Sequence, residues 1–331
     1  MSALPPLSIL DLAPVVEGAT TRDALLNSLD LVRLADELGY TRYWVAEHHN
    51  MEAVASSATA VLIGQLAAAS RRIRVGAGGI MLPNHAPLTI AEQFGTLAEL
   101  FPGRIDLGLG RAPGTDRPTM RALRRSLEST GEDAFPNDVM ELQSYFAPDP
   151  GHAVVRAVPG QGTEVPIWLL GSSLYGAQLA AYLGLPFAFA SHFAPDMLMQ
   201  ALQIYRATYK PSERHPKPHA MVGLNVIVAP TDEEARMLFT SAQQRFLGMV
   251  RGHRGKFPPP VASMDGLWTP TEEMQVQRML REAVVGSPET VRAGLAETAE
   301  RTGADEFIVA TAVHDHAHRR RSYELLSALA G

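Results

Sequence analysis

The 331-residue sequence contains no cysteine, and this absence excludes disulfide bonds, thiolate nucleophiles and cysteine-ligated zinc sites. The sequence also lacks the run of about 18 consecutive apolar residues that a membrane-spanning helix needs. Its first residues do not show the basic segment and apolar core that mark a secretory signal. We therefore expect a cytoplasmic protein.

An excess of positive charge is missing as well. The formal net charge at pH 7 is -6, so no global field attracts nucleic acid or anionic lipid. The phosphate-binding pattern G-x-x-x-x-G-K-[ST] does not occur, which argues against a nucleoside triphosphate ligand. His314, His316 and His318 stand close together, but no independent ligand cluster accompanies them. We interpret this segment as the first turn of a helix, where the helix dipole favours Asp315, rather than as a metal site.

Short apolar runs alternate with amphipathic segments along the whole sequence, which is typical of a parallel sheet covered by helices. We expect strands over residues 7–11, 43–46, 73–78, 105–108, 165–170, 187–190, 221–228 and 307–310. Eight strand–helix pairs fit a (β/α)8 TIM barrel, an α/β fold, better than a doubly wound sheet. No linker or internal repeat divides the sequence, so we expect residues 1–331 to form a single domain.

Two regions interrupt this alternation. Helices over roughly 116–130 and 137–147 precede a hairpin that we predict around 153–158. Residues near 250–280, which include three consecutive prolines from Pro258, are predicted to be an inserted loop region, and residues 250–270 are a candidate lid. Elsewhere, Thr20 and Thr231 each stand three residues before an acidic residue, the spacing of helix N-terminal caps.

In a TIM barrel the chemistry lies at the carboxyl ends of the strands, so the residues that follow each strand are the candidate site. Glu47, His48 and His49 follow the second strand. Successive side chains alternate in direction there, so the three cannot all face one way. The His48 imidazole can act in this position as a base or as a hydrogen-bond donor. A structural histidine bonded to loop backbone is an equally good interpretation.

Glycines follow the third strand, and an arginine follows the fourth. The segment with Gly78 and Gly79 lets a flat ligand approach the backbone, although a β-bulge explains the same glycines. Arg111 suits a phosphate or a developing anion, and a surface salt bridge is the alternative. The glycine spacing before Arg111 is not that of the dinucleotide-binding fingerprint.

Gly171, Ser172 and Ser173 follow the fifth strand and lead into an alanine-rich helix. Free N–H groups at a helix start, together with two hydroxyls, form an anion site. The alternative is that Ser172 or Ser173 simply caps the helix, which requires the same geometry.

Taken together, these segments resemble the bacterial luciferase family of flavin-dependent monooxygenases. The resemblance covers nearly the whole chain, in the family's order and spacing, and rests on residues 44–49, 75–83 with His85, 103–111 and 169–173. It implies a barrel that forms a homodimer, takes reduced FMN from a separate flavin reductase and uses O2 as co-substrate. The implied reaction oxygenates a small organic substrate, aldehyde- or ketone-like or aromatic, through a flavin hydroperoxide.

The resemblance also implies roles for individual residues. His48 matches the active-site histidine that stabilises or protonates the peroxide. Gly78 and Gly79 match a place where the family often has a non-proline cis peptide under the flavin ring. The phosphate-binding group matches Arg111, Gly171, Ser172 and Ser173. At Gly110 luciferase itself has a reactive cysteine, so oxygenation is implied here whereas light emission from a long-chain aldehyde is not.

Two other functions fit the same barrel. Relatives in the superfamily transfer hydride with a deazaflavin, and the strand-end motifs do not distinguish this cofactor from FMN. A non-catalytic flavin-binding barrel is the third interpretation, because a fold by itself does not establish an activity.

Overall fold

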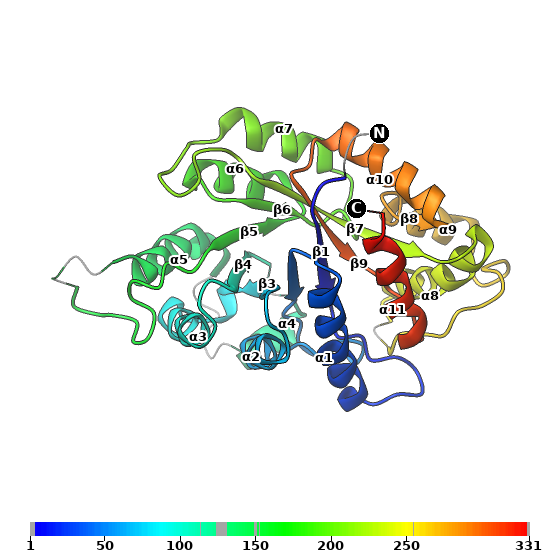
Figure 1. The fold of residues 1–331 in the computed structure, drawn as a ribbon, viewed down its shortest axis with the longest axis horizontal. Helices are drawn as coiled ribbons and strands as arrows, with labels where there is room; N and C mark the ends of the chain where they lie inside the picture. Colours follow the sequence, from blue (N-terminus) through cyan, green and yellow to red (C-terminus); the bar gives the residue numbers. More distant parts are fainter. Residues whose placement is uncertain are drawn as a thin grey trace.

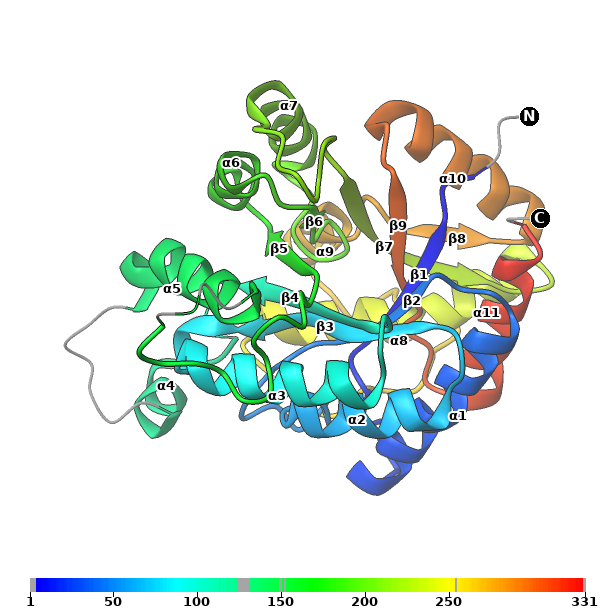
Figure 2. The ribbon, with the colours of Figure 1, turned by 60° about the vertical axis from the view of Figure 1, so that its left-hand side comes forward.

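A computed structural model describes residues 4–112, 114–123, 131–148, 151, 153–253 and 255–329. Parallel strands form a closed barrel at the centre of the molecule, with helices on its outside (Figures 1 and 2). In order around the barrel the strands are β1 (Leu7–Asp11), β2 (Arg42–Val45), β3 (Arg74–Met81), β4 (Ile105–Gly110), β5 (Ile167–Gly171), β6 (Phe187–Phe189), β7 (Ala220–Val228) and β9 (Glu306–Ala310). Pairing of β6 with β7 and of β9 with β1 closes the ring, which confirms the predicted TIM barrel.

The strands are buried on both faces, as parallel strands between a barrel interior and a helical layer must be. All nine residues of β7 are buried, and so are all residues of β1 and β4. Alternate side chains point inward and fill the barrel with one apolar cluster, which includes Leu10, Trp44, Trp168, Met221 and Ile308. The other side chains of each strand pack against the helices in the main core.

Helices that follow the strands cover the outside of the barrel. They are α1 (Thr21–Glu37), α2 (Thr59–Ala69), α3 (Pro87–Leu100), α5 (Gly131–Phe146), α6 (Leu174–Leu183), α7 (Leu198–Thr208), α10 (Pro288–Thr302) and α11 (His316–Ser327). The short helices η1 (Leu82–Asn84) and α4 (Arg117–Leu123) lie in the connections. Thr20 caps α1 in a capping box with Asp23, as predicted. In the described part of the chain, no helix combines the length and the apolarity that crossing a bilayer requires.

The insertion between β7 and α10 is larger and more ordered than the predicted loop. It contains α8 (Asp232–Val250), α9 (Pro270–Met279) and β8 (Val284–Gly286), and β8 extends the sheet beside the carboxyl end of β7. These elements lie together at one side of the barrel (Figure 1). The prediction of loop through residue 280 was therefore wrong for α9, although the capping box of Thr269 with Glu272 was a visible signal for this helix.

The hairpin predicted around residues 153–158 was also wrong. No strand forms over its described residues, and the Val154 side chain is 99% exposed. The alternation of apolar residues in this segment has no partner strand and no sheet face to cover, so the pattern did not produce a strand. The helix predicted over 116–130 corresponds to α4, and residues 124–130 lie outside the described residues.

Candidate active site

The carboxyl ends of β2, β3, β4 and β5 meet at one end of the barrel, and the predicted site residues follow these strands. Contacts between the loops fix their proximity. The Glu47 amide donates a hydrogen bond to the Gly79 carbonyl over 3.0 Å. The Arg111 guanidinium carbon lies 4.1 Å from the ring centre of Tyr175 in the first turn of α6. The segments after these four strands therefore form one rim.

Glu47 ties the end of β2 to the loop that follows β3. Its buried carboxylate accepts hydrogen bonds from Met81 N (3.0 Å), Asn84 Nδ2 (3.1 Å), His85 Nε2 (2.9 Å) and His49 Nε2 (2.8 Å). Burial alone would raise the pKa of Glu47, but the hydrogen bonds from the two histidines and the amide lower it. Glu47 and His49 therefore shape the loop.

His48 does not join this cluster and is instead coupled to a second histidine, His192, which follows β6. Both side chains are half-buried, and the Nδ1 atom of each is enclosed without a hydrogen-bond partner in the described structure. Burial lowers the pKa of His192 to about 4, with the neighbouring His48 as the second cause. Burial is also the largest cause of the lowered pKa of His48. At neutral pH both imidazoles are therefore uncharged, and each can donate one hydrogen bond and accept another.

His192 was not predicted as a site residue, although it follows a strand of the barrel in the same way as His48 does. Two residues of β7 hold it in place. Asn225 Nδ2 donates a hydrogen bond to the His192 carbonyl over 2.5 Å. Gly223 leaves room for the ring, since an added Cβ there would lie 2.7 Å from His192 Nδ1.

The peptide bond between Gly78 and Gly79 is cis, as the family resemblance implied. The register with β4 also shifts between Gly78 and Ile80, which confirms the β-bulge. Both glycines are required by close packing. A Cβ on Gly79 would lie 2.5 Å from the Gly108 carbonyl oxygen, and one on Gly78 would lie 2.9 Å from Cε3 of Trp44. The bulge places side-chain-free backbone at the rim, so the two interpretations of these glycines are compatible.

Arg111 has no carboxylate partner among the residues that the structure describes, so the surface salt bridge considered for it is not formed. Its guanidinium packs on the Tyr175 ring instead. This contact holds the charge at the amino-terminal end of α6. The structure therefore places Arg111 beside the first turn of α6, which Ser172 and Ser173 precede, and their joint role in binding a phosphate stays a prediction.

Ser173 occupies the N-cap position of α6, but its side chain forms no capping hydrogen bond, so the capping alternative is wrong for this residue. The N-cap side chains of α1, α8, α9, α10 and α11, by contrast, all accept a hydrogen bond from the first turn. Within the described chain, the Ser172 hydroxyl also lacks a partner. Two hydroxyls and the first-turn amides of α6 are thus available beside a guanidinium, an arrangement that suits a phosphate.

The segment near the carboxyl end folds as predicted. Asp315 caps α11 by accepting a hydrogen bond from the His318 amide over 2.9 Å. The neighbouring imidazoles face different partners, because His316 lies 2.8 Å from Asp30 Oδ2 and His314 lies 3.2 Å from the Glu17 carbonyl. His314 and His316 therefore contact neighbouring segments of the protein at the start of α11.

Several described residues of the candidate lid, predicted over 250–270, are fastened to the body of the protein. Phe257 forms a parallel bridge with Val16, and its backbone exchanges hydrogen bonds with the loop after β1. Thr240 of α8 bonds both backbone groups of Val261. These contacts hold Phe257 and Val261 in place beside the rim. The packing of the segment therefore does not support a movable lid, which stays a prediction.

A sequence profile described as luciferase-like monooxygenase matches residues 8–306. A luciferase-like monooxygenase of Escherichia coli (strain K12) is 56% identical over 318 residues, which cover 96% of this chain and 95% of the relative. The N-acetyl-S-alkylcysteine monooxygenase of Bacillus subtilis (strain 168) is 32% identical and covers 97% of both chains. The crystal structure of apo-MsnO8 superposes with a TM-score of 0.91 at 39% identity, over 98% of each chain.

Proposed function

This chain belongs to the luciferase-like monooxygenase family, and on that premise we propose that it uses reduced FMN and O2 to oxygenate a small organic substrate. One observation carries the choice of a phosphate-bearing flavin. Arg111 lies beside the uncapped first turn of α6, on the same rim as the uncharged His48–His192 pair. A cofactor with an anionic tail and a flat reactive ring fits such a rim.

The proposal assigns each rim residue a part in holding FMN. Arg111, the Ser172 and Ser173 hydroxyls and the first-turn amides of α6 would bind the phosphate. Gly171 lies against this helix start, where an added Cβ would be in ordinary contact with Gly176 Cα at 3.4 Å. The backbone at Gly78 and Gly79 would support the ring, since no side chain covers it there.

Reduced FMN, when bound, would supply the electrons that activate O2. The chain's own contribution lies in its histidines and in the exclusion of water. Because the pKa of His48 is lowered, its imidazole is uncharged at neutral pH, so its unpartnered nitrogen would form a hydrogen bond with the reacting oxygen group rather than transfer a proton to it. His192 lies opposite with its own unpartnered nitrogen. The apolar barrel interior beneath them keeps water from the reacting atoms.

Three further statements belong to the proposal. A separate flavin reductase supplies the reduced FMN, the chain forms a homodimer, and the protein works in the cytoplasm. The substrate itself is a small organic molecule for which aldehyde- or ketone-like and aromatic compounds are the first to test.

The test begins with the cofactor. The purified protein is titrated with FMN and with a deazaflavin, and Arg111→Gln is titrated in parallel. We expect selective FMN binding that weakens about 10- to 100-fold in the variant, because a charged hydrogen bond is lost. A strong preference for the deazaflavin would replace oxygenation by hydride transfer as the function.

The second part of the test concerns catalysis. Single-turnover reaction of the reduced FMN complex with O2 and a panel of small aldehydes, ketones and sulfides is followed for wild type and His48→Ala. We expect substrate oxygenation to slow at least 100-fold in the variant. His318→Ala is the control, because that side chain is 53% exposed on α11. Unchanged turnover in His48→Ala would remove its assigned role, and oxygen consumption no faster than with free flavin would indicate a non-catalytic barrel.

A further inference from the structure

The Tyr175 ring is the surface on which the Arg111 guanidinium rests. Arg111 follows β4, Tyr175 lies in the first turn of α6, and the guanidinium carbon is 4.1 Å from the ring centre. The two side chains meet because of the sheet register. Gly110 at the end of β4 pairs with Leu170 near the end of β5, and α6 begins shortly after β5 ends.

The packing of Tyr175 keeps its ring in place. The side chain is half-buried and packs, like that of Leu174, against the main core of the protein. Arginine, by contrast, has a long side chain with many rotamers, and holding it in one orientation costs conformational entropy. A ring anchored in the core therefore offers Arg111 a fixed support at the rim.

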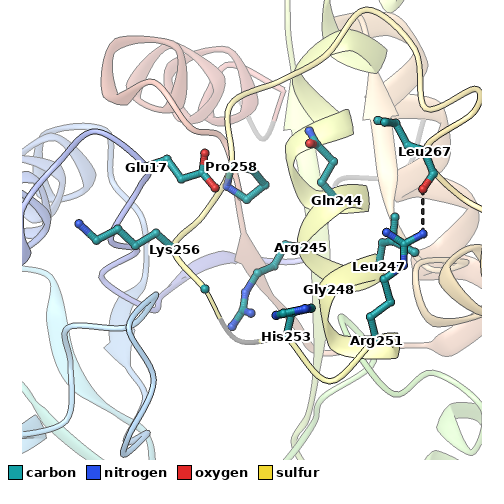
Figure 3. A pocket seen from close by; sticks show the side chains of 11 residues that line it. Glu17, Gln244, Arg245, Leu247, Gly248, Arg251, His253, Lys256, Pro258 and Leu267 are labelled. Carbon is teal, nitrogen blue, oxygen red and sulfur yellow. Dashed lines mark hydrogen bonds between the residues drawn. The ribbon is translucent and has the colours of Figure 1, made fainter.

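The contact with Tyr175 holds Arg111 without occupying its hydrogen-bond donors. The π electrons of the ring attract the cation, so no acceptor atom is required, and the Arg111 N–H groups have no acceptor among the described residues. Figure 3 shows the opposite case in Arg251, at the end of α8. Its guanidinium donates to the Leu267 carbonyl over 2.9 Å and to both Glu272 carboxylate oxygens over 2.8 and 3.0 Å. Arg111 thus keeps the donors that a phosphate would accept.

We propose that Tyr175 is a positioning residue for the cofactor phosphate, because its ring holds Arg111 beside the first turn of α6 before the cofactor binds. The inference rests on the proposed function and adds a residue that acts through Arg111. A cation that is already oriented loses less side-chain entropy on binding than a free one. Loss of the ring should therefore weaken the binding of a flavin that carries a phosphate, but not of one that lacks it.

The experiment compares FMN with riboflavin, which has the same ring system and no phosphate. The Kd values of both oxidised flavins are measured by fluorescence titration for wild type, Tyr175→Leu and Tyr175→Phe. We expect Tyr175→Leu to weaken FMN binding about fivefold and to leave riboflavin binding unchanged. Tyr175→Phe keeps the ring and should retain the wild-type affinity for FMN.

Tyr182→Leu is the matched control. Tyr182 lies in the same helix and also carries a cation on its ring, since the Lys210 ammonium is 3.9 Å from the ring centre. Tyr182 is 61% exposed, and neither residue of this pair belongs to the proposed site. The control variant should therefore bind both flavins like wild type. If Tyr175→Leu does not fold, Tyr175→Met takes its place in every comparison.

A double-mutant cycle tests whether Tyr175 acts through Arg111. The combination of Arg111→Gln with Tyr175→Leu should bind FMN no more weakly than Arg111→Gln alone, because without the guanidinium the ring has nothing to hold. A residue that only stabilises the fold would weaken FMN binding equally in both backgrounds.

Three results would overturn the inference while the flavin function stands. Equal losses for FMN and riboflavin would assign Tyr175 to the flavin ring or to the fold. A loss in Tyr175→Phe as large as in Tyr175→Leu would assign the effect to the phenol hydroxyl. Additive losses in the double variant would mean that Tyr175 acts independently of Arg111. A wild type that binds riboflavin as tightly as FMN, or binds neither, would instead remove the phosphate site of the proposed function and this inference with it.

Discussion

At the amino-terminal end of the barrel, ion pairs join the charged side chains, whereas at the carboxyl-terminal end several polar side chains have no partner within the described chain. Arg42 bridges Asp106 at 2.8 Å and Glu306 at 2.7 Å, and all three are buried. At the opposite end His48 and His192 each keep an enclosed nitrogen without a hydrogen bond. Both ends are built from the same strands, so the difference in side-chain pairing reflects a structural role for the amino-terminal end and a binding role for the carboxyl-terminal end.

The paired side chains at the amino-terminal end stabilise the fold, whereas the unpartnered side chains at the carboxyl-terminal end can bind a ligand. A buried polar group without a partner costs free energy of folding, about 1–3 kcal/mol. Such groups persist at functional sites, where a bound molecule supplies the missing partner. Substitutions at the amino-terminal end should therefore affect unfolding, and substitutions at the rim should affect binding and turnover.

The largest effect is expected for Arg42→Met. Loss of the guanidinium leaves Glu306 buried without this cation, while Asp106 keeps its ion pair with Arg74 at 2.6 Å, so the free energy of unfolding should fall by about 3 kcal/mol. Urea denaturation of wild type and variant measures this loss. The control is Arg214→Met, which breaks an ion pair with Glu164 between half-exposed side chains and should cost less than about 1 kcal/mol. Equal losses in both variants would mean that the buried ion pairs at the amino-terminal end of the barrel stabilise the fold no more than an exposed pair does.

A smaller effect is expected from pH at the rim. The pKa of His192 falls from 6.5 in the unfolded chain to about 4 in the folded protein, so the unfolded state binds more protons between these values. The free energy of unfolding should therefore decrease as the pH falls from 6.5 to 4, by up to about 3 kcal/mol. His48 contributes in the same direction, since its pKa is also lowered.

His192→Gln isolates this contribution. The substitution removes the titrating group, so the decrease between pH 6.5 and 4 should become shallower in urea denaturation at a series of pH values. His318→Gln removes an exposed imidazole whose surface pair with Asp315 contributes little, so this variant should retain most of the wild-type slope. A variant curve parallel to wild type would show that His192 does not carry the pH dependence.

The sequence was sufficient for the barrel because its strands are buried on both faces, and continuous apolar runs such as that of β7 are easily distinguished from amphipathic helices. It was insufficient where local pattern and tertiary context disagree. The apolar alternation near Val154 predicted a hairpin, but no strand lies beside it. The helix α9 was missed because the preceding prolines indicated loop, although Thr269 and Glu272 carry a capping signal.

The location of the candidate site could be predicted from the sequence, but not all of its residues could. Strand ends identified His48 and Arg111, because in a barrel all carboxyl ends meet at one rim. The pairing of His48 with His192 required the closure of the barrel, which brings β2 and β6 to face each other from distant parts of the sequence. Whether Ser173 caps its helix depends on the direction of one hydroxyl, which no spacing encodes.

The smallest expected effect is on FMN binding at the start of α6, and it distinguishes residues that bind a ligand from residues that stabilise the fold. The double substitution Ser172→Ala with Ser173→Ala should weaken FMN binding about tenfold, because two hydroxyl contacts to the phosphate are lost. It should leave the urea midpoint unchanged, since Ser173 forms no capping hydrogen bond. Thr231→Ala should do the reverse, because Thr231 caps α8 through the Glu234 amide, and its loss should cost about 1 kcal/mol of unfolding free energy without affecting FMN. If the serine variant loses stability and keeps its FMN affinity, the start of α6 belongs with the structural residues and the phosphate must bind elsewhere.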